Sequence, residues 1–362
     1  PLDSSNITWT RPTVRIQLMK FLAHNSAAQI VTLNAEIVTA RMKISRGLTP
    51  STSRPYSVVT IGNFDGHHHG HRALLDRVVA TARREAGTAL VLTFDPHPVK
   101  ILAPQVNLMF LTTPEEKLAR FEAAGIDEVV FLEFTTAFAA LSPAQFAKQV
   151  LCDGIGTREL YVGEHFAFGK GRAGRIADLL ELGAQLGFRV HPMAPVTIDG
   201  EVVSSTRIRQ LIQAGELQKA VRLLGRPYSI EGTVISGAHR GTELGWPTAN
   251  LRLPEGRVIP PDGVYAAQVS WKGSGLNAVV YIGTRPTFGA GERLLEVSIL
   301  DERLELYGEV IRVDLLGFIR EDRVFASAEA LTRQIALDVD AARAQLRDAG
   351  ITASLSALQP RS

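Results

Sequence analysis

The sequence predicts a doubly wound α/β domain followed by an antiparallel β domain that ends in a helix. Three observations support this fold class. The chain has 362 residues, which suits two domains. Between residues 56 and 225, short β-branched runs alternate with helical patterns, as in a parallel sheet with right-handed crossovers. After Pro227, strand-like runs follow one another with only turns between them.

The strands of the first domain are continuous apolar runs, which is typical of strands buried on both faces of a parallel sheet. They cover Tyr56–Ile61, Ala89–Phe94, Glu128–Leu132 and Glu159–Val162. An apolar stripe after the first run predicts an amphipathic helix; it comprises Leu74, Leu75, Val78, Val79 and Ala82. Capping residues followed by proline predict two further helix starts, at Thr113 and Ser142.

The second domain is predicted to be an antiparallel sheet or barrel. Its strand-like runs are Gly263–Trp271, Leu276–Ile282, Leu294–Leu300 and Val310–Leu315. A final helix is expected from a cap at Ser327 to about Leu346. Its candidate packing residues are Leu331, Ile335, Leu337 and Val339.

The predicted domain limits are 42–225 and 226–362, because Gly225-Arg-Pro227 breaks the helical pattern. Met42 starts a stretch that resembles a natural beginning, so we interpret 1–41 as a poorly ordered extension of little function. This leader lacks the apolar region and cleavage site of a secretory signal. A transit peptide stays an alternative, since Arg11, Arg15 and Arg41 outnumber the nearby acids.

Composition excludes several classes of protein. Hydrophobic residues make up 45% and charged residues 21%, as in an ordinary globular protein. The formal net charge of +2 gives no overall electrostatic footprint for nucleic acid. No apolar run reaches the roughly 20 residues of a membrane span. The single cysteine, Cys152, is predicted to be a buried thiol and suits a reducing cytoplasm, where we expect the protein to work.

The stretch Ile61-Gly-Asn-Phe-Asp-Gly-His-His-His-Gly-His71 joins a predicted strand to a predicted helix. Its glycines let the backbone approach a ligand, and the helix start offers N–H groups and a positive dipole to phosphate. His68 and His71 have H-x-G-H spacing and can donate hydrogen bonds to a triphosphate. A chance cluster of histidines or a metal site is the alternative, although a tight zinc site usually has separated ligands and a fixed second shell. Phosphate handling is therefore our interpretation.

A second candidate for phosphate binding begins at Ser204. Hydroxyl groups at a helix start can cap it, and Arg207 in the first turn can pair with a phosphate that the helix dipole also attracts. The alternative is an ordinary capped helix with arginines facing solvent.

Four motifs together resemble bacterial bifunctional riboflavin kinase/FMN adenylyltransferase, also known as FAD synthetase, of the H-x-G-H nucleotidyltransferase superfamily. They are Gly62-Asn-Phe-Asp-Gly66 with His68-x-Gly-His71, Phe94-Asp-Pro-His-Pro98, Tyr161-Val-Gly-Glu-His-Phe-Ala-Phe-Gly169 and Ser204-Ser-Thr-Arg-Ile-Arg209. The resemblance covers about residues 42 to 350. It implies a Rossmann-like adenylyltransferase domain followed by a β-barrel riboflavin kinase domain with a C-terminal helix.

For the first half, the resemblance implies that FMN phosphate attacks the α-phosphorus of ATP and that pyrophosphate leaves. Catalysis then rests on holding and neutralising two anions, a task for magnesium, His68, His71 and Arg207. The implied nucleotide-binding residues are Gly62, Asn63, Phe64, Asp65, Gly66, Gly70, Ser204, Ser205 and Thr206. Asp65 is equally well explained as a structural turn residue. The implied flavin-binding residues are Phe94, Pro96, His97, Pro98, His165 and Phe168.

For the second half, Gly245-Trp-Pro-Thr-Ala-Asn250 resembles the G-F-P-T-A-N motif of riboflavin kinases. The resemblance makes Thr248 and Asn250 neutral oxygen ligands for magnesium. It also makes Glu296, within Leu295-Glu-Val-Ser298, the base that takes a proton from the ribityl hydroxyl as this attacks the γ-phosphorus of ATP. The remaining implied nucleotide-binding residues are Gly237, Arg240, Gly245, Pro247, Gly263 and Tyr265.

Some positions depart from the family pattern. They are His67, His69, His165, His239 and Thr242. His165 replaces a residue that is often Asn or Asp, so an imidazole takes the place of an amide or carboxylate. Reduced adenylyltransferase turnover is a possible consequence.

We therefore expect an enzyme that uses ATP and Mg²⁺, takes riboflavin and FMN as substrates, produces FAD, and has no nucleic-acid or membrane partner. Its oligomeric state is not predicted. One alternative retains only the kinase activity. The other is a flavin- or nucleotide-binding regulatory protein on the same fold.

Overall fold

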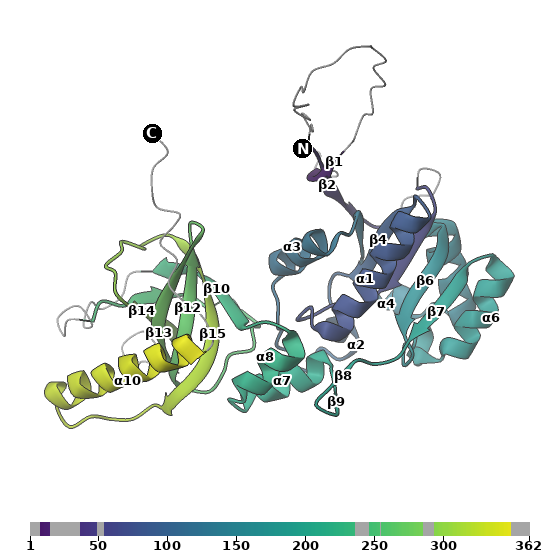
Figure 1. Ribbon diagram of the computed structural model, residues 1–362. Coiled ribbons are helices and arrows are strands. Elements are labelled where there is room, and N and C mark those ends of the chain that lie inside the picture. Colours follow the sequence, from purple (N-terminus) through teal and green to yellow (C-terminus); the bar gives the residue numbers. More distant parts are fainter. Residues whose placement is uncertain are drawn as a thin grey trace, which may run out of the picture. The chain divides into compact units, whose positions relative to one another are not determined.

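The computed structural model describes residues 8–14, 37–48, 54–235, 246–253, 255–284 and 293–348. It forms two compact units (Figure 1). The first unit comprises Pro1–Phe64, Gly70–Val106 and Pro114–Pro195. The second unit comprises Val196–Ser362 together with two short segments from earlier in the chain, Asp65–His69 and Asn107–Thr113. The functional boundary near residue 225 stays a prediction.

The first unit contains a seven-stranded sheet with the order β1-β2-β5-β4-β3-β6-β7. The strands are β1 (Thr8–Val14), β2 (Ile37–Arg46), β3 (Ser57–Ile61), β4 (Thr88–Phe94), β5 (Glu128–Leu132), β6 (Thr157–Gly163) and β7 (Arg189–Met193). All neighbours are parallel except the pair β1 and β2. The predicted parallel sheet is confirmed. β2, which joins β5 through Lys43–Arg46, was not predicted, and neither were β1 and β7.

Helices cover both faces of this sheet. They are α1 (His69–Arg84), α2 (Pro98–Leu102), α3 (Pro114–Ala124), α4 (Thr136–Ala139), α5 (Pro143–Gln145) and α6 (Ile176–Leu186), with a π-helical segment, η1 (Phe146–Ile155), and a 3-10 turn, η2 (Lys170–Arg172). Val58 packs into one core cluster with α1, and its neighbour Val59 packs into another with η1, because successive strand side chains face opposite ways. The predicted capping box at Ser142 is present. Cys152 is only half-buried.

The second unit begins with a two-stranded hairpin, β8 (Thr197–Ile198) and β9 (Glu201–Val202), and two helices, α7 (Ser205–Gln213) and α8 (Leu217–Leu224). A closed antiparallel barrel with the order β10-β11-β14-β13-β12-β15 follows, which confirms the predicted barrel. Its strands are β10 (Tyr228–Ile235), β11 (Ala249–Leu251), β12 (Gly263–Trp271), β13 (Ser274–Thr284), β14 (Arg293–Ile299) and β15 (Val310–Glu321).

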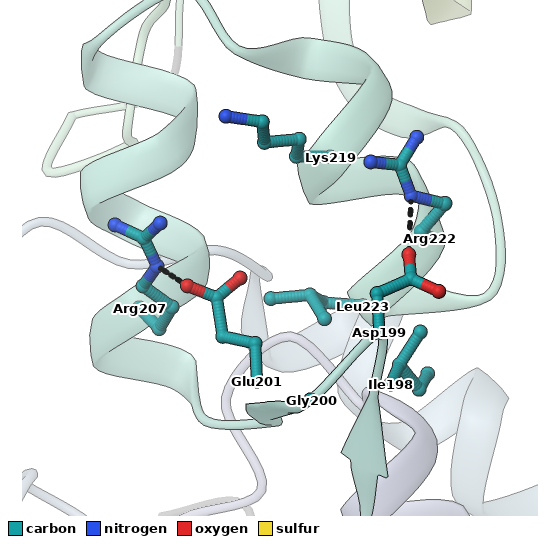
Figure 2. A pocket seen from close by; sticks show the side chains of 8 residues that line it. All are labelled: Ile198, Asp199, Gly200, Glu201, Arg207, Lys219, Arg222 and Leu223. Carbon is teal, nitrogen blue, oxygen red and sulfur yellow. Dashed lines mark hydrogen bonds and ion pairs between the residues drawn. The ribbon is translucent and has the colours of Figure 1, made fainter.

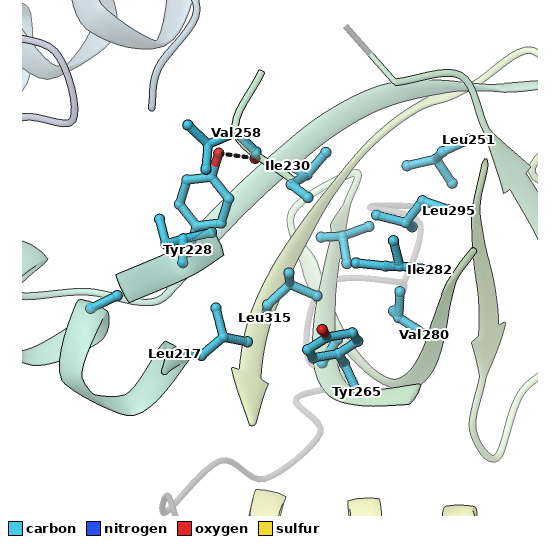
Figure 3. Packing of buried hydrophobic residues seen from close by; sticks show 14 of the residues in the cluster. Leu217, Tyr228, Ile230, Leu251, Val258, Tyr265, Val280, Ile282, Leu295 and Leu315 are labelled. Carbon is cyan, nitrogen blue, oxygen red and sulfur yellow. Dashed lines mark hydrogen bonds between the residues drawn. The ribbon is translucent and has the colours of Figure 1, made fainter. Parts of the chain in front are cut away.

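The barrel interior is filled by side chains rather than open. Tyr228, Tyr265 and Leu315 are fully buried among aliphatic residues of the other strands (Figure 3). The final helix, α10 (Ala328–Asp348), packs through Val339, with Ile335 partly buried beside it. Ser327 caps it as predicted, by accepting a hydrogen bond from the Ala330 N–H. The packing role expected of Leu337 is wrong.

Leu337 is 61% exposed because it lies on the outer face of α10. Among the residues described, no helix is long and apolar enough to cross a membrane.

Candidate functional site

The loop after β3 contains the predicted phosphate site. In the first unit, the Gly62 N–H donates to the Leu92 carbonyl at 3.1 Å. Phe64 has a left-handed backbone (φ +50°), and its buried ring lies 5.1 Å from the ring of His71. The Oδ1 atom of Asn63 is buried with no hydrogen-bond partner within the described part of the chain. This acceptor is therefore free for a ligand donor.

The second unit contains the middle of the same loop, and Asp65 is its anchor. The buried Asp65 carboxylate accepts hydrogen bonds from the backbone N–H groups of Leu111 and Thr112, at 3.0 Å each, and from the Thr112 hydroxyl. Arg209 Nη2 donates to the same carboxylate at 2.6 Å. The Gly66 N–H donates to Thr112 Oγ1 at 3.1 Å. Since the carboxylate is fully engaged inside the protein, its contacts are those of a structural anchor.

His68 follows Asp65 in this loop and is 5% exposed. Burial lowers the pKa of His68 from 6.5 to about 4; Asp65 acts in the opposite direction, while the charges of His69 and Arg209 lower the pKa further. The imidazole is therefore neutral at pH 7. A neutral imidazole can still donate one hydrogen bond to a phosphate oxygen, but it brings no positive charge.

The remaining predicted residues of this loop lie at or just before the start of α1. His69, Gly70 and His71 are its first three residues, so they lie where the helix has unpaired N–H groups and the positive end of its dipole. His67 has a left-handed backbone (φ +46°). Within the described ranges, no group of three or more His, Cys, Asp or Glu residues is arranged to hold a metal ion.

Helix α7 carries the second predicted phosphate-binding segment. Ser204 caps it by accepting from the Arg207 N–H at 3.2 Å, as predicted. The Ser205 hydroxyl donates to the Asp65 carbonyl at 2.7 Å, and Thr206 is exposed. The start of α7 is thus hydrogen-bonded to the loop that presents His68.

Arg207 lines a separate cavity of about 400 Å³ within the second unit (Figure 2). The β8–β9 hairpin lies on one side of it, and α7 and α8 supply the cations Arg207, Lys219 and Arg222. Figure 2 shows Arg207 paired with Glu201 (2.5 Å) and Arg222 paired with Asp199 (3.0 Å). Each of these two guanidinium groups therefore has a carboxylate partner in the protein itself.

Arg209 is the residue that sequence reasoning missed. It ends the quoted Ser204–Arg209 motif, but Arg207 was chosen because it lies in the first turn of the helix. The structure gives Arg209 the buried ion pair with Asp65, and its side chain is only 14% exposed. The second arginine of Arg207-Ile-Arg209 was the sequence feature that could have indicated this residue.

The predicted flavin-binding residues lie in the first unit, at the last residue of β4 and on the segments that follow β4 and β6. Phe94 packs against Phe134 and Phe138, and Phe168 is buried. The Asp95–Pro96 peptide is cis, and His97 caps α2, which starts at Pro98, by accepting from the Val99 N–H. His165 is different, since its side chain is 84% exposed beside Glu164.

The barrel brings together the predicted kinase residues. Asn250 on β11 is paired directly with Glu296 on β14, so their side chains share one face of the sheet. Both residues are 5% exposed, and the Asn250 Oδ1 has no hydrogen-bond partner in the described ranges. Thr248 is half-buried just before β11. An orphaned buried oxygen beside a carboxylate fits a site that is completed by a hard cation.

Two predicted nucleotide-binding residues, Gly263 and Tyr265, lie at the start of β12. The Tyr265 hydroxyl donates to the Pro261 carbonyl at 2.6 Å, and burial raises the pKa of Tyr265 to about 12. A Cβ atom on Gly263 would lie 2.5 Å from the Arg320 carbonyl oxygen, so only glycine fits there. Pro247 is exposed, and its carbonyl accepts from the Ser298 hydroxyl at 3.3 Å.

The remaining predicted kinase-half positions, Gly237, Arg240 and Gly245, lie outside the described residues, as do His239 and Thr242.

Comparison with known proteins finds two family models that match successive parts of the chain. A family model described as FAD synthetase matches residues 51–207, and one described as riboflavin kinase matches residues 224–346. The chain is 38% identical over 305 residues to the bifunctional riboflavin kinase/FMN adenylyltransferase of Escherichia coli K12. This match covers 83% of this chain and 97% of that protein. The chain belongs to the bifunctional riboflavin kinase/FMN adenylyltransferase family.

Other members of the bifunctional family are similarly related. The Pseudomonas fluorescens protein is 40% identical over 288 residues, covering 79% of this chain and 92% of that protein. The Bacillus subtilis protein is 34% identical over 287 residues, covering 78% and 90%. A solved structure described as a macrolide-efflux protein from Streptococcus pneumoniae has a TM-score of 0.74 and 29% identity, over 83% of this chain and 98% of that one.

Proposed function

We propose that this enzyme phosphorylates riboflavin to FMN with ATP and then adenylylates FMN to FAD with release of pyrophosphate. The observation that carries the proposal is the match of a FAD synthetase model and a riboflavin kinase model to successive parts of one chain. Residues 42–225 are proposed to perform the adenylylation, residues 226–362 the phosphorylation, and residues 1–41 neither. The single cysteine supports a reducing compartment, and we place the reactions in the cytoplasm.

In the kinase reaction, Glu296 is the proposed general base. It accepts the proton of the ribityl hydroxyl while the hydroxyl oxygen forms a bond to the γ-phosphorus of ATP and the bond to the β-phosphate oxygen breaks, which releases ADP. Burial of Glu296 supports this role, because a dry carboxylate has few competing water contacts. The Tyr281 hydroxyl, on the strand beside Glu296, stays neutral, since burial raises the pKa of Tyr281 to about 12.

Thr248 and Asn250 are the proposed magnesium ligands. The fit rests on the buried, unpartnered Asn250 Oδ1, since neutral side-chain oxygens suit a hard cation that also binds phosphate oxygens. When bound, Mg²⁺ offsets the negative charge of the ATP phosphates. Asn250 and Thr248 would orient it, and Glu296 lies beside Asn250 to receive the substrate hydroxyl.

In the adenylylation, no protein nucleophile is needed. An FMN phosphate oxygen forms the bond to the α-phosphorus of ATP, and the bond to the β-phosphate oxygen breaks so that pyrophosphate leaves. His68, whose ring is neutral, and His71 are proposed to donate hydrogen bonds to the phosphates, together with the N–H groups at the start of α1. Arg207 is proposed to supply positive charge to the same reaction once a phosphate competes with Glu201 for its guanidinium.

A timed chromatographic assay with riboflavin, ATP and Mg²⁺ tests the proposal. FMN should appear first and FAD second. FMN that accumulates without FAD would favour the kinase-only alternative. Tight flavin binding without conversion would favour the regulatory alternative. His68→Ala should stop FAD formation from supplied FMN while FMN formation continues, and an unchanged FMN-to-FAD rate would remove His68 from the site.

A further inference from the structure

The loop that contains His68 has an unfavourable backbone conformation, which contacts from outside the loop must stabilise. Three residues in a row of four, Phe64, Gly66 and His67, have left-handed φ angles of +50°, +84° and +46°. For the two non-glycine residues this conformation costs about 1 kcal/mol or more each, so surrounding contacts must impose it. The contacts that do so identify the residues that position His68.

Those contacts come from segments distant in the sequence. Asp65 is held by the N–H groups of Leu111 and Thr112, and the Gly66 N–H by the Thr112 hydroxyl. The Gly66 carbonyl accepts from Arg226 Nη2 at 2.9 Å. Arg226 Nη1 donates at the same time to the Pro227 carbonyl, at 3.0 Å. Arg226 thus holds the loop with one nitrogen, while the other bonds the carbonyl of its neighbour Pro227, which directly precedes β10.

The segment that holds Asp65 is itself attached to the barrel side of the second unit. The Phe110 N–H donates to the Gly256 carbonyl at 2.6 Å, and the Val258 N–H donates to the Phe110 carbonyl at 3.0 Å. Leu111 is 1% exposed and belongs to the barrel core cluster that also contains Tyr228. A Cβ atom on Gly66 would lie 2.6 Å from Leu111 Cδ1, so Leu111 also packs closely against the loop.

We propose that Arg226 is a positioning residue for the FMN adenylylation, although it lies within the part of the chain that matches the riboflavin kinase model. Arg226, from the kinase half, fixes the Gly66 carbonyl. The Phe110–Thr112 segment, which is itself hydrogen-bonded to Gly256 and Val258 of the kinase half, fixes Asp65. Arg226 touches neither reacting atoms nor substrate in this scheme; it acts through the conformation of the loop. The inference rests on the proposed function, since it concerns how His68 is presented for that reaction.

The test compares both activities in the full-length protein. Arg226→Gln removes the charged donor, and the lost hydrogen bond should lower kcat for FMN-to-FAD conversion about tenfold. KM for FMN should change little, and riboflavin phosphorylation should stay within about twofold of wild type, since Glu296 and Asn250 are untouched. Arg226→Lys retains a donor and should recover part of the loss.

Arg83→Gln is the matched control. The Arg83 guanidinium also donates to a backbone carbonyl, that of Gly125 at 2.9 Å, and pairs with Asp127, outside the loop. Both activities should be unchanged in this variant. A second readout is hydrogen–deuterium exchange of the peptide spanning residues 62–70, which should exchange faster in Arg226→Gln than in Arg83→Gln.

The outcomes separate the two ideas. A wild-type protein that forms no FAD would refute the proposed function, and the exchange experiment would still test whether Arg226 holds the loop. If wild type forms FAD and Arg226→Gln forms it equally fast, the positioning role is refuted. An equal fall in both activities would also overturn it, because Arg226 would then merely stabilise the barrel.

Discussion

His68 should remain neutral far below the pH at which an ordinary histidine becomes charged. The folded-state pKa is about 4 because the side chain is buried, whereas the unfolded chain has the ordinary value of 6.5. At pH 6 about 1% of His68 is then protonated in the folded protein, against about three quarters of a free histidine. Lowering the pH from 8 to 5.5 should therefore leave the His68 imidazole uncharged.

The sign of the stability effect follows from the depressed pKa. The neutral ring is accommodated and the charged ring is not, so the folded state has its full stability above pH 6.5. This contribution is lost as the pH falls from 6.5 towards 4, and its upper limit is on the order of 3 kcal/mol. His68→Gln should remove that part of the acid sensitivity.

The assay is a titration of the histidine ring resonances by NMR, with the His68 signal assigned by its absence in His68→Gln. Its chemical shift should be flat between pH 8 and 5.5. The pH profile of kcat/KM for FMN adenylylation should likewise show no inflection near 6.5 caused by protonation of His68. A His68 resonance that titrates with a midpoint near 6.5 would refute the inference that this ring acts as a neutral donor.

Four further predictions follow from named contacts. Glu296→Gln should lower FMN formation at least a hundredfold and leave FAD formation from supplied FMN nearly intact; equal loss of both would contradict its role as base. Asn250→Ala should raise the Mg²⁺ concentration needed for half-maximal kinase activity severalfold, and an unchanged metal dependence would argue against Asn250 as a ligand. Arg209→Met leaves the Asp65 carboxylate without its buried partner and should destabilise the protein by about 3 kcal/mol, measured by urea unfolding. Burial raises the pKa of Glu159, but the hydrogen bond from Tyr56 and the charges of Arg189 and His191 bring this pKa below its usual range. The loss of unfolding free energy caused by Glu159→Gln should therefore be largest at neutral pH and shrink as the pH falls below about 4.5. A loss that does not change with pH would exclude this ion network as its cause.

The local patterns of the sequence predicted most of the regular structure. Runs such as Ala89–Phe94 and the Ser142 cap are decided by neighbouring residues, so periodicity and capping chemistry were sufficient. β2 was missed because its place in the sheet depends on pairing with β5, more than 80 residues away in the sequence. Such a pairing leaves no signal within the strand itself.

The candidate site was predictable in its residue types but not in its supports. H-x-G-H spacing pointed to His68 and His71, and the G-x-P-T-A-N pattern pointed to Asn250. The contact of Arg226 with Gly66 spans 160 positions and depends on the folded path of both segments. The choice between Arg207 and Arg209 likewise depended on which side chain faces Asp65, a question that only the structure answers.

The attachment of Phe110 to Val258 has a consequence for the order in which the protein is made. A ribosome adds roughly 5–20 residues per second, so the chain between Asp65 and Val258 takes roughly 10–40 s to synthesise. The parallel sheet can form once β7 has been synthesised, which falls within that interval. The segment that anchors Asp65 still lacks its hydrogen-bond partners at Gly256 and Val258 at that point. The nascent chain therefore completes its sheet early and its H-x-G-H loop late, after the first barrel residues have emerged.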